Sequence, residues 1–451
     1  MMRGVAPLTA RREPWMDQLL ADPDACAELL AEHGSPVNVI DTTPMARNAA
    51  ELNRAAQQAG VPLLVQVARK ANKALAVVDE AHRLGLGVDV GSERELRQVL
   101  QRMPADRLVL TAAVKPESLL RLCLDADVLV ALDNADEADE LARLAAERGV
   151  TARVALRIPP PAGSGLTPSR FGQSPASWLA WLQRRPSVSV EGVHFHLHGY
   201  SAAERVQLLQ VALELVAALR EAGHPAGFID IGGGIPMSYL DDPGQWEDFW
   251  REHREALQGD EPITWRGHPL GTVYPYHQQP VRGPWLAELL ASPCGTGSVA
   301  EQFVERGLEL RCEPGRAMLD GCGMTLARVC FRKTTSDGRN IVGLEMNRTQ
   351  CRSTSDDFMV DPLLVRPTSA REPSAPMEAW LVGAYCIEAE LIMMRRFAFS
   401  QGVAVGDVVA IPNTGGYLMH ILESASHQIP LARNVSRTTG QSRFTLDPID
   451  A

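Results

Sequence analysis

The sequence predicts a protein of the α/β class, in which a TIM-type (β/α)8 barrel is followed by a C-terminal β domain. Between residues 62 and 313, eight short apolar segments alternate with amphipathic segments. Short apolar strands are typical of a parallel sheet that is buried on both faces. Eight consecutive βα units indicate a closed barrel. After about residue 320 the pattern changes to β-like runs separated by turns.

The composition argues against several classes of protein. The 451 residues suffice for two or three domains, and the net charge of −11 comes without any basic cluster, which argues against nucleic acid or an anionic membrane as partner. No apolar run approaches the length of a membrane span, and the opening Met1–Gly4 lacks the apolar core of a signal peptide. The eight cysteines are scattered without CxxC pairs, as expected for free thiols. We therefore expect a cytoplasmic protein with a small-molecule substrate.

The chain before the barrel is expected to contribute to both domains. Residues 1–36 have a mostly helical pattern, and residues 37–40 form a short strand that can join the β domain. Thr43 and Pro44 then suit the start of a helix that runs to about residue 59. The expected parts are an N-terminal segment at 1–40, a barrel at 41–320 and a β domain at 321–451.

The barrel elements follow one another in a regular order. The predicted strands are 62–68, 86–90, 107–112, 127–132, 152–158, 188–196, 228–231 and 308–313. The predicted helices between them are 73–84, 92–102, 115–122, 135–148, 176–184, 202–222 and 245–257. Residues 258–307 are rich in Pro, Gly, Trp and Tyr, and we expect them to form an insertion over the barrel mouth. In the β domain, the predicted strands include Met324–Lys333, Arg339–Met346, Ala379–Val382 and Asp407–Ile411.

Lys70 follows the first barrel strand. Catalytic groups of such barrels gather at the C-terminal ends of the strands, so a lysine at this position is expected to face the barrel mouth. A desolvated amine whose pKa falls can attack a carbonyl and form a Schiff base. The alternative is a solvated lysine in a βα loop.

The other strand ends carry residues that suit a phosphorylated aldehyde. Asp89, Arg157 and His194 end the second, fifth and sixth strands. The glycines that end the seventh strand let a backbone approach an anion closely, or form a plain turn; they are Gly232, Gly233 and Gly234. Gly315 in the next loop can add amide donors to the same phosphate.

Glu313 ends the eighth strand and is buried by pattern, so it needs a cationic or hydrogen-bonding partner. A protonated pyridine nitrogen would serve, and Arg316 is the alternative partner. His194, His196 and His198 alternate along the sixth strand, which allows either a metal site or one imidazole stacked on a planar cofactor. We favour the second reading and expect no metal.

Two glycine-flanked loops of the β domain present further reactive groups. Gly383-Ala384-Tyr385-Cys386 presents a thiol, and Asn413-Thr414-Gly415-Gly416-Tyr417 presents a phenol. Alternatively, Cys386 is a small hydrophobic residue buried in the core, and Tyr417 is a core aromatic residue.

With these motifs assembled, the chain resembles the fold-type III pyridoxal-phosphate (PLP) enzymes, specifically the diaminopimelate/ornithine decarboxylase family, as a divergent member. The motifs that carry the resemblance are Ala68–Asn72 (usually VKAN), Gly87–Leu96, Ser169–Gly172 (SKFG), Gly192–His196 (GxHFH), the glycine triplet, Glu313–Arg316, Gly383–Cys386 and Gly416-Tyr417. They run over nearly the whole chain in the family's order. The resemblance implies the barrel-plus-β-domain architecture of alanine racemase and ornithine decarboxylase.

The resemblance also implies a role for each matching residue. Lys70 would hold PLP as the internal aldimine, His196 would stack on the ring and Glu313 would pair with its nitrogen. Asp89 and Arg157 would support Lys70 and the ring. The phosphate would be held by Gly232 to Gly234, Gly315 and Tyr417, and Arg316 would also bind the cofactor. Cys386 would come from the partner subunit of a homodimer and deliver a proton to the substrate carbon.

Departures from the family pattern bear on the substrate. The loop Leu197–Ser201 is longer than the usual Ile-Gly-Ser after the stacking histidine. Ile387 stands where an acidic residue often reads a distal amine, with Glu388 next to it. The RPxLY segment that helps to recognise diaminopimelate is missing, and Asp361 stands near where an arginine is expected. We therefore expect a substrate other than diaminopimelate, contacted by Arg316, Asp361, Ile387 and Glu388. Asp361 could pair with a substrate amine or could cap a turn.

The expected activity is PLP-dependent α-decarboxylation of an amino acid through Lys70, with PLP as an electron sink. Racemisation or epimerisation on the same cofactor is the main alternative. A PLP-binding regulator without turnover and a metal hydrolase built on the histidine triplet are weaker ones. Cys386 favours decarboxylation over racemisation.

Overall fold

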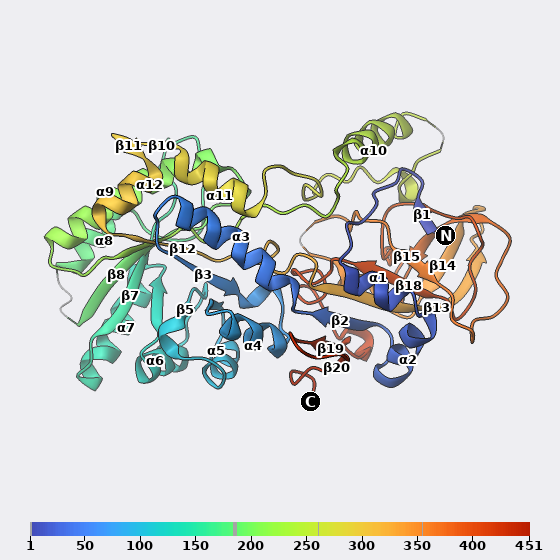
Figure 1. Cartoon of the computed structure of the whole chain (residues 1–451), viewed down its shortest axis with the longest axis horizontal. Helices are drawn as coiled ribbons and strands as arrows, with labels where there is room; N and C mark the ends of the chain where they lie inside the picture. The colour runs from blue at the N-terminus through green and yellow to red at the C-terminus, as the bar shows by residue number, and fades with distance from the viewer. Residues whose placement is uncertain (1, 184–186, 260, 354) are drawn as a thin grey trace.

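The computed structural model describes residues 2–183, 187–259, 261–353 and 355–451. It shows a closed barrel of eight parallel strands beside a second, mostly antiparallel sheet of ten strands (Figure 1). The predicted barrel and β domain architecture is therefore confirmed.

The barrel strands match the eight predicted segments. In chain order they are β3 (Leu63–Ala68), β4 (Gly87–Val90), β5 (Leu108–Leu110), β6 (Leu129–Leu132), β7 (Ala152–Arg157), β8 (Val188–His194), β9 (Phe228–Asp230) and β12 (Glu309–Cys312). Strand β12 pairs with both β3 and β9, which closes the cylinder. Val109, Leu129, Ala131, Ala155 and Phe228 form one buried cluster from strands that are not all neighbours. The barrel interior is thus packed with side chains, which leaves the strand ends for chemistry.

The helices around the barrel are α3 (Pro44–Gln58), α4 (Leu75–Arg83), α5 (Glu93–Leu100), α6 (Glu117–Ala126), α7 (Ala135–Arg148), α8 (Pro175–Leu182), α9 (Ala202–Glu221), α11 (Arg282–Ala291) and α12 (Val299–Arg306). Several begin as the sequence predicts. Pro44 is the first residue of α3, and the Ser201 hydroxyl caps α9 by accepting from the Glu204 amide. The end predicted for the helix 176–184 lies outside the described residues.

The expectation for the N-terminal segment is met in part, and the place expected for the seventh helix is wrong. Residues 2–4 form strand β1 (Met2–Gly4), which pairs with β17 (Phe397–Phe399), so the helical pattern begins only at α1 (Pro14–Leu20), followed by α2 (Pro23–His33). Helix α10 (Pro243–Ala256) does not cover the barrel: it lies over the β-rich half (Figure 1), where the Arg395 guanidinium is 5.1 Å from the Phe249 ring. The apolar face of α10 packs against the other domain. A period of 3.6 residues in the sequence predicts that a helix face is buried, but it does not show which domain buries that face.

The predicted insertion at 258–307 is also revised. Only its first half, up to about residue 281, crosses to the β-rich half, where Thr264 bridges Arg395 and the Trp265 amide donates to Met394. Its second half contains α11, which packs against α3 and α9, and α12, which leads into β12. These two helices complete the wall of the barrel.

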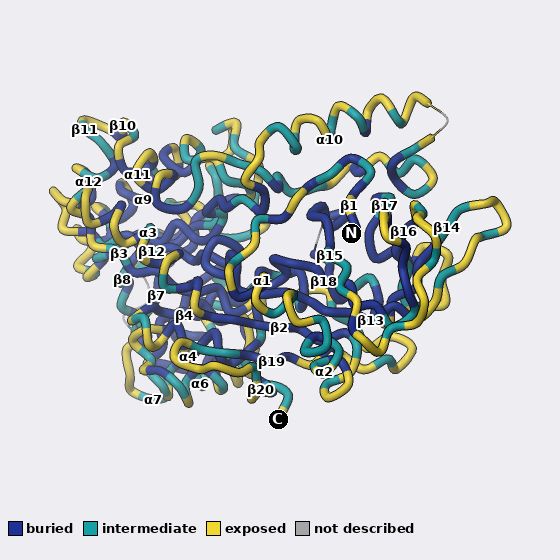
Figure 2. The backbone as a smooth tube through the Cα atoms, turned by 45° about the vertical axis from the view of Figure 1, so that its right-hand side comes forward, coloured by how far each residue is buried: buried dark blue, intermediate teal, exposed yellow. Residues whose placement is uncertain are grey.

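The second sheet combines strands from both ends of the chain. Its main path is β1, β17, β16 (Met377–Val382), β14 (Asn340–Leu344), β13 (Gly323–Thr334), β2 (Val37–Asp41), β19 (Arg433–Arg437) and β20 (Thr445–Leu446), with β15 (Leu363–Val365) and β18 (Val408–Pro412) attached. The early strand β2 lies between β13 and β19. Buried backbone runs through the barrel and through β2 and β13 (Figure 2).

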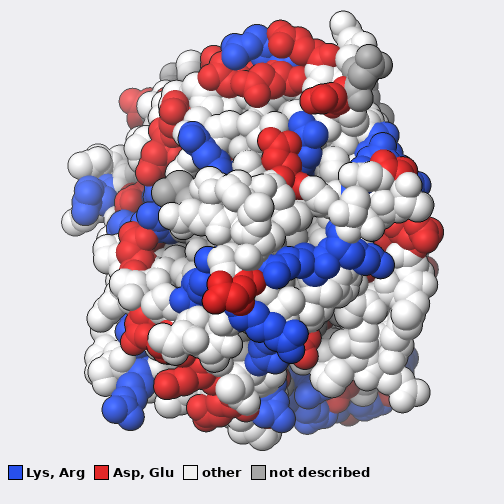
Figure 3. Space-filling model, turned by 90° about the vertical axis from the view of Figure 1, so that its right-hand side faces the viewer, with Lys and Arg blue, Asp and Glu red and all other residues white. Residues whose placement is uncertain are grey.

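Positive and negative side chains are interspersed over the end of the molecule formed by this sheet (Figure 3). Among the described residues, no helix combines the length and apolar character needed to cross a bilayer.

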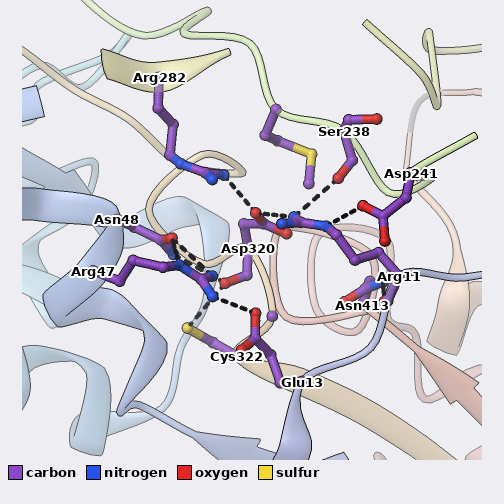
Figure 4. Close-up of polar contacts among 12 residues, drawn as sticks. Arg11, Glu13, Arg47, Asn48, Ser238, Asp241, Arg282, Asp320, Cys322 and Asn413 are labelled. Carbon is purple, nitrogen blue, oxygen red and sulfur yellow. Dashed lines mark hydrogen bonds and ion pairs between the residues drawn. The ribbon is translucent and has the colours of Figure 1, made fainter. Parts of the chain in front are cut away.

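A polar network joins the barrel to the N-terminal segment at Asp320 (Figure 4). One carboxylate oxygen of Asp320 accepts from Arg282 on α11, at 2.5 Å, and from Arg11. The Asn48 side chain on α3 donates to the Asp320 carbonyl at 2.9 Å. The Asp320 side chain is fully buried and compensates both guanidinium groups, whose other carboxylate partners are the more exposed Glu51 for Arg282 and Asp241 for Arg11.

Replacing Asp320 with asparagine should lower the free energy of unfolding by about 3–5 kcal/mol, because two cations lose the charge of a buried partner. Urea unfolding followed by circular dichroism measures this loss. The matched control is Asp241→Asn, whose side chain also contacts Arg11 but is 75% exposed, and it should change stability by less than about 1 kcal/mol. Equal effects of the two variants would contradict the role given to Asp320.

Candidate active site

Lys70 lies directly after β3, in a 3-10 turn formed by Arg69–Ala71. Its Nζ donates to Asp89 Oδ2 at 3.1 Å. Asp89 ends β4, is buried and accepts a second bond from the Thr111 hydroxyl at the end of β5. The expected fall of the Lys70 pKa does not occur in this state: the Asp89 carboxylate raises the pKa, and its effect exceeds the opposing effect of burial.

The Lys70 turn is tied to the β domain of the same chain. The Tyr417 amide donates to the Ala71 carbonyl at 2.7 Å, and the Asn72 side chain donates to the Gly415 carbonyl at 2.9 Å. Tyr417 itself has a left-handed backbone with φ +71°. Barrel and β domain therefore meet at the lysine.

The glycine triplet follows β9 and packs against His196. Gly232 and Gly234 have φ +65° and +74°, where glycine is favoured. The Gly233 amide donates to His196 Nδ1 at 3.1 Å, so the proton of a neutral ring lies on Nε2. Burial lowers the pKa of His196 to about 4, which keeps the ring neutral at physiological pH.

Glu313 ends β12 and is buried next to His194. His194 Nε2 lies 3.1 Å from Glu313 Oε1. Arg157 donates through Nε to His194 Nδ1 at 3.1 Å and through a terminal nitrogen to Asp133 at 3.3 Å. The alternative Glu313–Arg316 ion pair is absent among the described residues.

His194, Asp230 and Glu313 bring three potential metal-ligand atoms within 4.8 Å of one another. Both nitrogens of His194 already have hydrogen-bond partners, as given above. Within the described ranges, His196 and His198 do not join this group. The alternating histidines therefore do not assemble as the ligand set of the metal-hydrolase alternative.

A cavity of about 440 Å³ opens at this end of the barrel. Its wall includes His196, the loop 197–200, Gly234, Gly315 and Tyr417. The crossing segment contributes residues 272–275, and Ser353 and Ser355 come from the β-rich half. The cavity thus lies between the predicted cofactor residues and two further segments, of which 272–275 belongs to the insertion expected over the barrel mouth.

Arg316 also lines the cavity and has no carboxylate partner in the described part of the chain. Its guanidinium lies 3.4 Å from the centre of the Tyr274 ring and donates to the Ser353 hydroxyl at 3.1 Å. The buried Nε has no hydrogen-bond partner. Arg316 can therefore bind an anion from this cavity.

Of the four residues predicted to contact the substrate, only Arg316 lines the cavity, and the predicted proton donor Cys386 does not line it either. The predicted contact of Asp361 with the substrate is wrong. The Asp361 side chain is buried in an ion pair with Arg395 at 2.8 Å and accepts from the Leu8 amide, so it is not available to a substrate. Cys386, Ile387 and Glu388 lie on an exposed loop after β16.

Sequence reasoning also missed several residues of the site. Asp133 directly follows β6, so the strand-end rule that selected Asp89 could have found it. Thr111 likewise follows β5. Tyr274 and Ser353 reach the cavity from loops, and no local signal marks them.

Three comparisons place the chain among known proteins. Residues 46–264 match the family model of the pyridoxal-dependent decarboxylases, pyridoxal binding domain. An uncharacterized protein, y4yA, of Sinorhizobium fredii is 32% identical over 89% of this chain and 87% of that protein. The diaminopimelate decarboxylase of Zymomonas mobilis is 25% identical over 90% and 89%.

Solved structures show the same fold. The diaminopimelate decarboxylase of M. jannaschi superimposes with a TM-score of 0.70 at 20% identity, covering 93% of this chain and 90% of that chain. A lysine/ornithine decarboxylase of Vibrio vulnificus, complexed with putrescine, gives 0.68 at 16% identity over 95% and 99%. The chain therefore belongs to the family of pyridoxal-dependent decarboxylases of fold type III.

Proposed function

We propose that this protein removes the α-carboxyl group of an amino acid, using PLP held by Lys70. The observation that carries the proposal is the meeting of Lys70, His196, Glu313 and the glycine triplet at one end of the barrel, in a member of the decarboxylase family. Each of the four has a distinct chemical use toward PLP.

The residues fit the cofactor. Glu313 has one carboxylate oxygen held by His194, so the other can accept from a protonated pyridine nitrogen. A Cβ on Gly315 would lie 2.8 Å from the Tyr417 ring, and one on Gly233 would lie 3.0 Å from the Glu313 carbonyl. These close approaches leave backbone amides and the Tyr417 phenol as donors for a phosphate, with Arg316 beside them.

PLP, when bound, supplies the electron sink that accepts the electron pair of the bond to the carboxyl group. The chain supplies position and proton control. Lys70 is the attachment point, and Asp89 holds its amine in place at 3.1 Å. His196 offers a neutral, flat ring toward the cavity, and the surrounding loops limit the access of water.

Cys386 is proposed to act in the site of a partner subunit. Its loop is exposed in this chain, and Ile387 is 48% exposed beside it. Ile421, which lines the cavity, and the adjacent Leu422 are each 41% exposed. A homodimer would cover these apolar side chains and bring the thiol to the reacting carbon.

The cavity supports a substrate with an anionic or neutral far end. Among the described residues of the wall, Arg316 has no carboxylate partner and keeps an unpartnered Nε. Asp361, the candidate partner for a substrate amine, is instead paired with Arg395. Glu388 of the exposed loop is then the remaining candidate for recognising an amine. A substrate other than diaminopimelate is proposed on this basis.

The experiment is a screen of the purified holoenzyme against L- and D-amino acids, including acidic ones, for release of CO₂ and of the corresponding amine. Stoichiometric CO₂ and amine are expected with one or a few substrates. Inversion of configuration without CO₂ would show that the enzyme is a racemase and would refute the proposal. A protein that binds PLP but turns over none of the panel would instead support the regulator alternative.

Replacing Gly315 with alanine should raise the Kd for PLP at least about tenfold, because the added methyl group displaces the Tyr417 ring and a misplaced buried contact costs about 1–3 kcal/mol. Fluorescence titration of the apoprotein with PLP measures this change. The control is Gly227→Ala, where the new Cβ would lie 3.6 Å from its nearest contact, and PLP affinity should stay unchanged. If Gly315→Ala and Gly227→Ala bound PLP with equal affinity, the proposed role of the Gly315 loop in holding the PLP phosphate would be wrong.

A further inference from the structure

A row of buried polar groups runs from the side of the barrel to Glu313. Lys115 Nζ donates to Glu137 at 2.8 Å, and the same Glu137 oxygen accepts from the Asp133 amide at 3.0 Å. The Asp133 carboxylate faces Arg157, which contacts His194. Within this row only Glu313 would contact the pyridine nitrogen. Arg157, which the resemblance assigns to the support of Lys70 and the ring, donates instead to His194 and Asp133.

The direction of each hydrogen bond next to His194 is fixed by chemistry. The Nε of Arg157 can only donate, because a guanidinium has no acceptor. His194 Nδ1, at 3.1 Å, must therefore accept. Burial and the neighbouring Arg157 charge lower the pKa of His194 well below its usual value, so the ring is neutral. Its one proton then lies on Nε2 and is donated to Glu313 Oε1.

Arg157 is itself held so that its Nε points to His194. Asp133 accepts from an Arg157 terminal nitrogen and from the Gly172 amide at 2.9 Å. The Phe171 ring lies 4.6 Å from the guanidinium carbon. Arg157 and Asp133 are nearly buried, which leaves this geometry little freedom.

We propose that Arg157 and His194 form a positioning pair that holds Glu313 as an ionised hydrogen-bond acceptor and so keeps a proton on the pyridine nitrogen of PLP. This inference rests on the proposed function. A carboxylate that accepts an N–H bond is stabilised in its charged form, and protonating it would weaken that bond. The proton shared between Glu313 and the pyridine therefore stays on the nitrogen, where it strengthens the electron sink.

The other charges around His194 do not reverse this assignment. Lys70 and Lys115 add positive charge, which disfavours an imidazolium, while Asp89 favours it. Asp230 lies within 4.8 Å of both His194 and Glu313, and burial raises its pKa well above the usual value. A carboxyl group whose pKa is raised is less ionised at a given pH, so Asp230 adds less of the negative charge that would draw a second proton to the ring.

The test is the ¹⁵N resonance of the pyridine nitrogen in protein reconstituted with ¹⁵N-labelled PLP, at neutral pH. Wild type should show a protonated nitrogen. His194→Leu removes the donor to Glu313, and the signal should shift toward the unprotonated position, with kcat lower by about 10–100-fold, as for other outer partners of a site. His194→Gln restores an acceptor and a donor and should return the signal toward wild type. A protonated signal in His194→Leu would overturn the proposal.

A second measurement uses the protein without its cofactor. In cofactor-free wild type labelled with [¹⁵N]histidine, His194 should give the resonances of the Nε2–H tautomer, and the His194→Gln spectrum identifies its signals. An Nδ1–H ring or an imidazolium would overturn the proposal. A wild type without a visible PLP band or without CO₂ release would instead count against the proposed function.

Discussion

Replacing Lys70 with alanine is expected to abolish the visible absorption band of lysine-linked PLP and to lower kcat/KM by more than about 10⁴-fold. The residue would supply both the covalent attachment and a positioned proton-transfer group, and acid–base catalysis alone contributes about 10²–10⁴-fold. Ultraviolet–visible spectra of the reconstituted protein and CO₂ release measure the two effects.

The chain offers few alternatives to Lys70. Its sequence contains four lysines, at 70, 73, 115 and 333. Lys73 is paired with Glu423 at 2.6 Å, and Lys115 is buried against Glu137 at 2.8 Å. Lys333 lies at the far end of β13, in the other domain. Lys70 pairs with Asp89 at 3.1 Å and lies near enough to Glu313 for the two charges to interact.

The control is Lys73→Ala, which changes a lysine three positions along the same turn. It should keep the visible band, because its partner Glu423 is outside the proposed PLP contacts. Borohydride should fix the cofactor to wild type and Lys73→Ala but not to Lys70→Ala. A band or turnover that survives in Lys70→Ala would show that the attachment point is wrong.

The state of Lys70 shows a limit of local reasoning. Its place after an apolar strand predicted both the barrel mouth and a lowered pKa. The location is correct, because parallel strands end on one side of a barrel. The pKa moves in the other direction because Asp89, on the next strand, lies at 3.1 Å. A strand-end list names both residues but does not give the distance between them.

The same reasoning explains which parts of the fold the sequence predicts. Barrel strands such as β3 and β4 are short and mostly apolar because both faces are buried, so each leaves a local signal. Helix α10 has an equally clear amphipathic pattern, but its apolar face packs on the β-rich half through Phe249 and Arg395. Periodicity reports that a face is buried and not which partner buries it.

The residues of the cavity wall show how far the sequence alone can predict substrate specificity. Motifs led to Glu313, Gly315 and Arg316 because backbone and charge requirements restrict residue types there. Ser353 and Tyr274 reach Arg316 from different loops, and many residue types could fill such positions. Asp361 was chosen by its place in the chain, whereas its side chain serves an ion pair with Arg395.

Replacing Cys386 with alanine is expected to lower kcat by about 10²–10⁴-fold, the usual contribution of a positioned proton donor. The larger change in activity is expected when two variant proteins are mixed so that their subunits exchange. Cys386→Ala and Lys70→Ala should each be nearly inactive, yet together recover about a quarter of wild-type activity, because half the dimers are mixed and each has one intact site of two in a two-fold assembly. Tagged subunits verify that exchange has occurred.

The matched control uses the second exposed cysteine, Cys330 on β13. Cys330→Ala should retain full activity alone, and mixing it with Lys70→Ala should give only the activity of its own sites. Recovery in the Cys386 mixture requires that the thiol and the lysine of one site come from different chains. Exchange without recovery would mean that Cys386 serves its own subunit or has no part in the reaction, and the exposed loop after β16 would need another role.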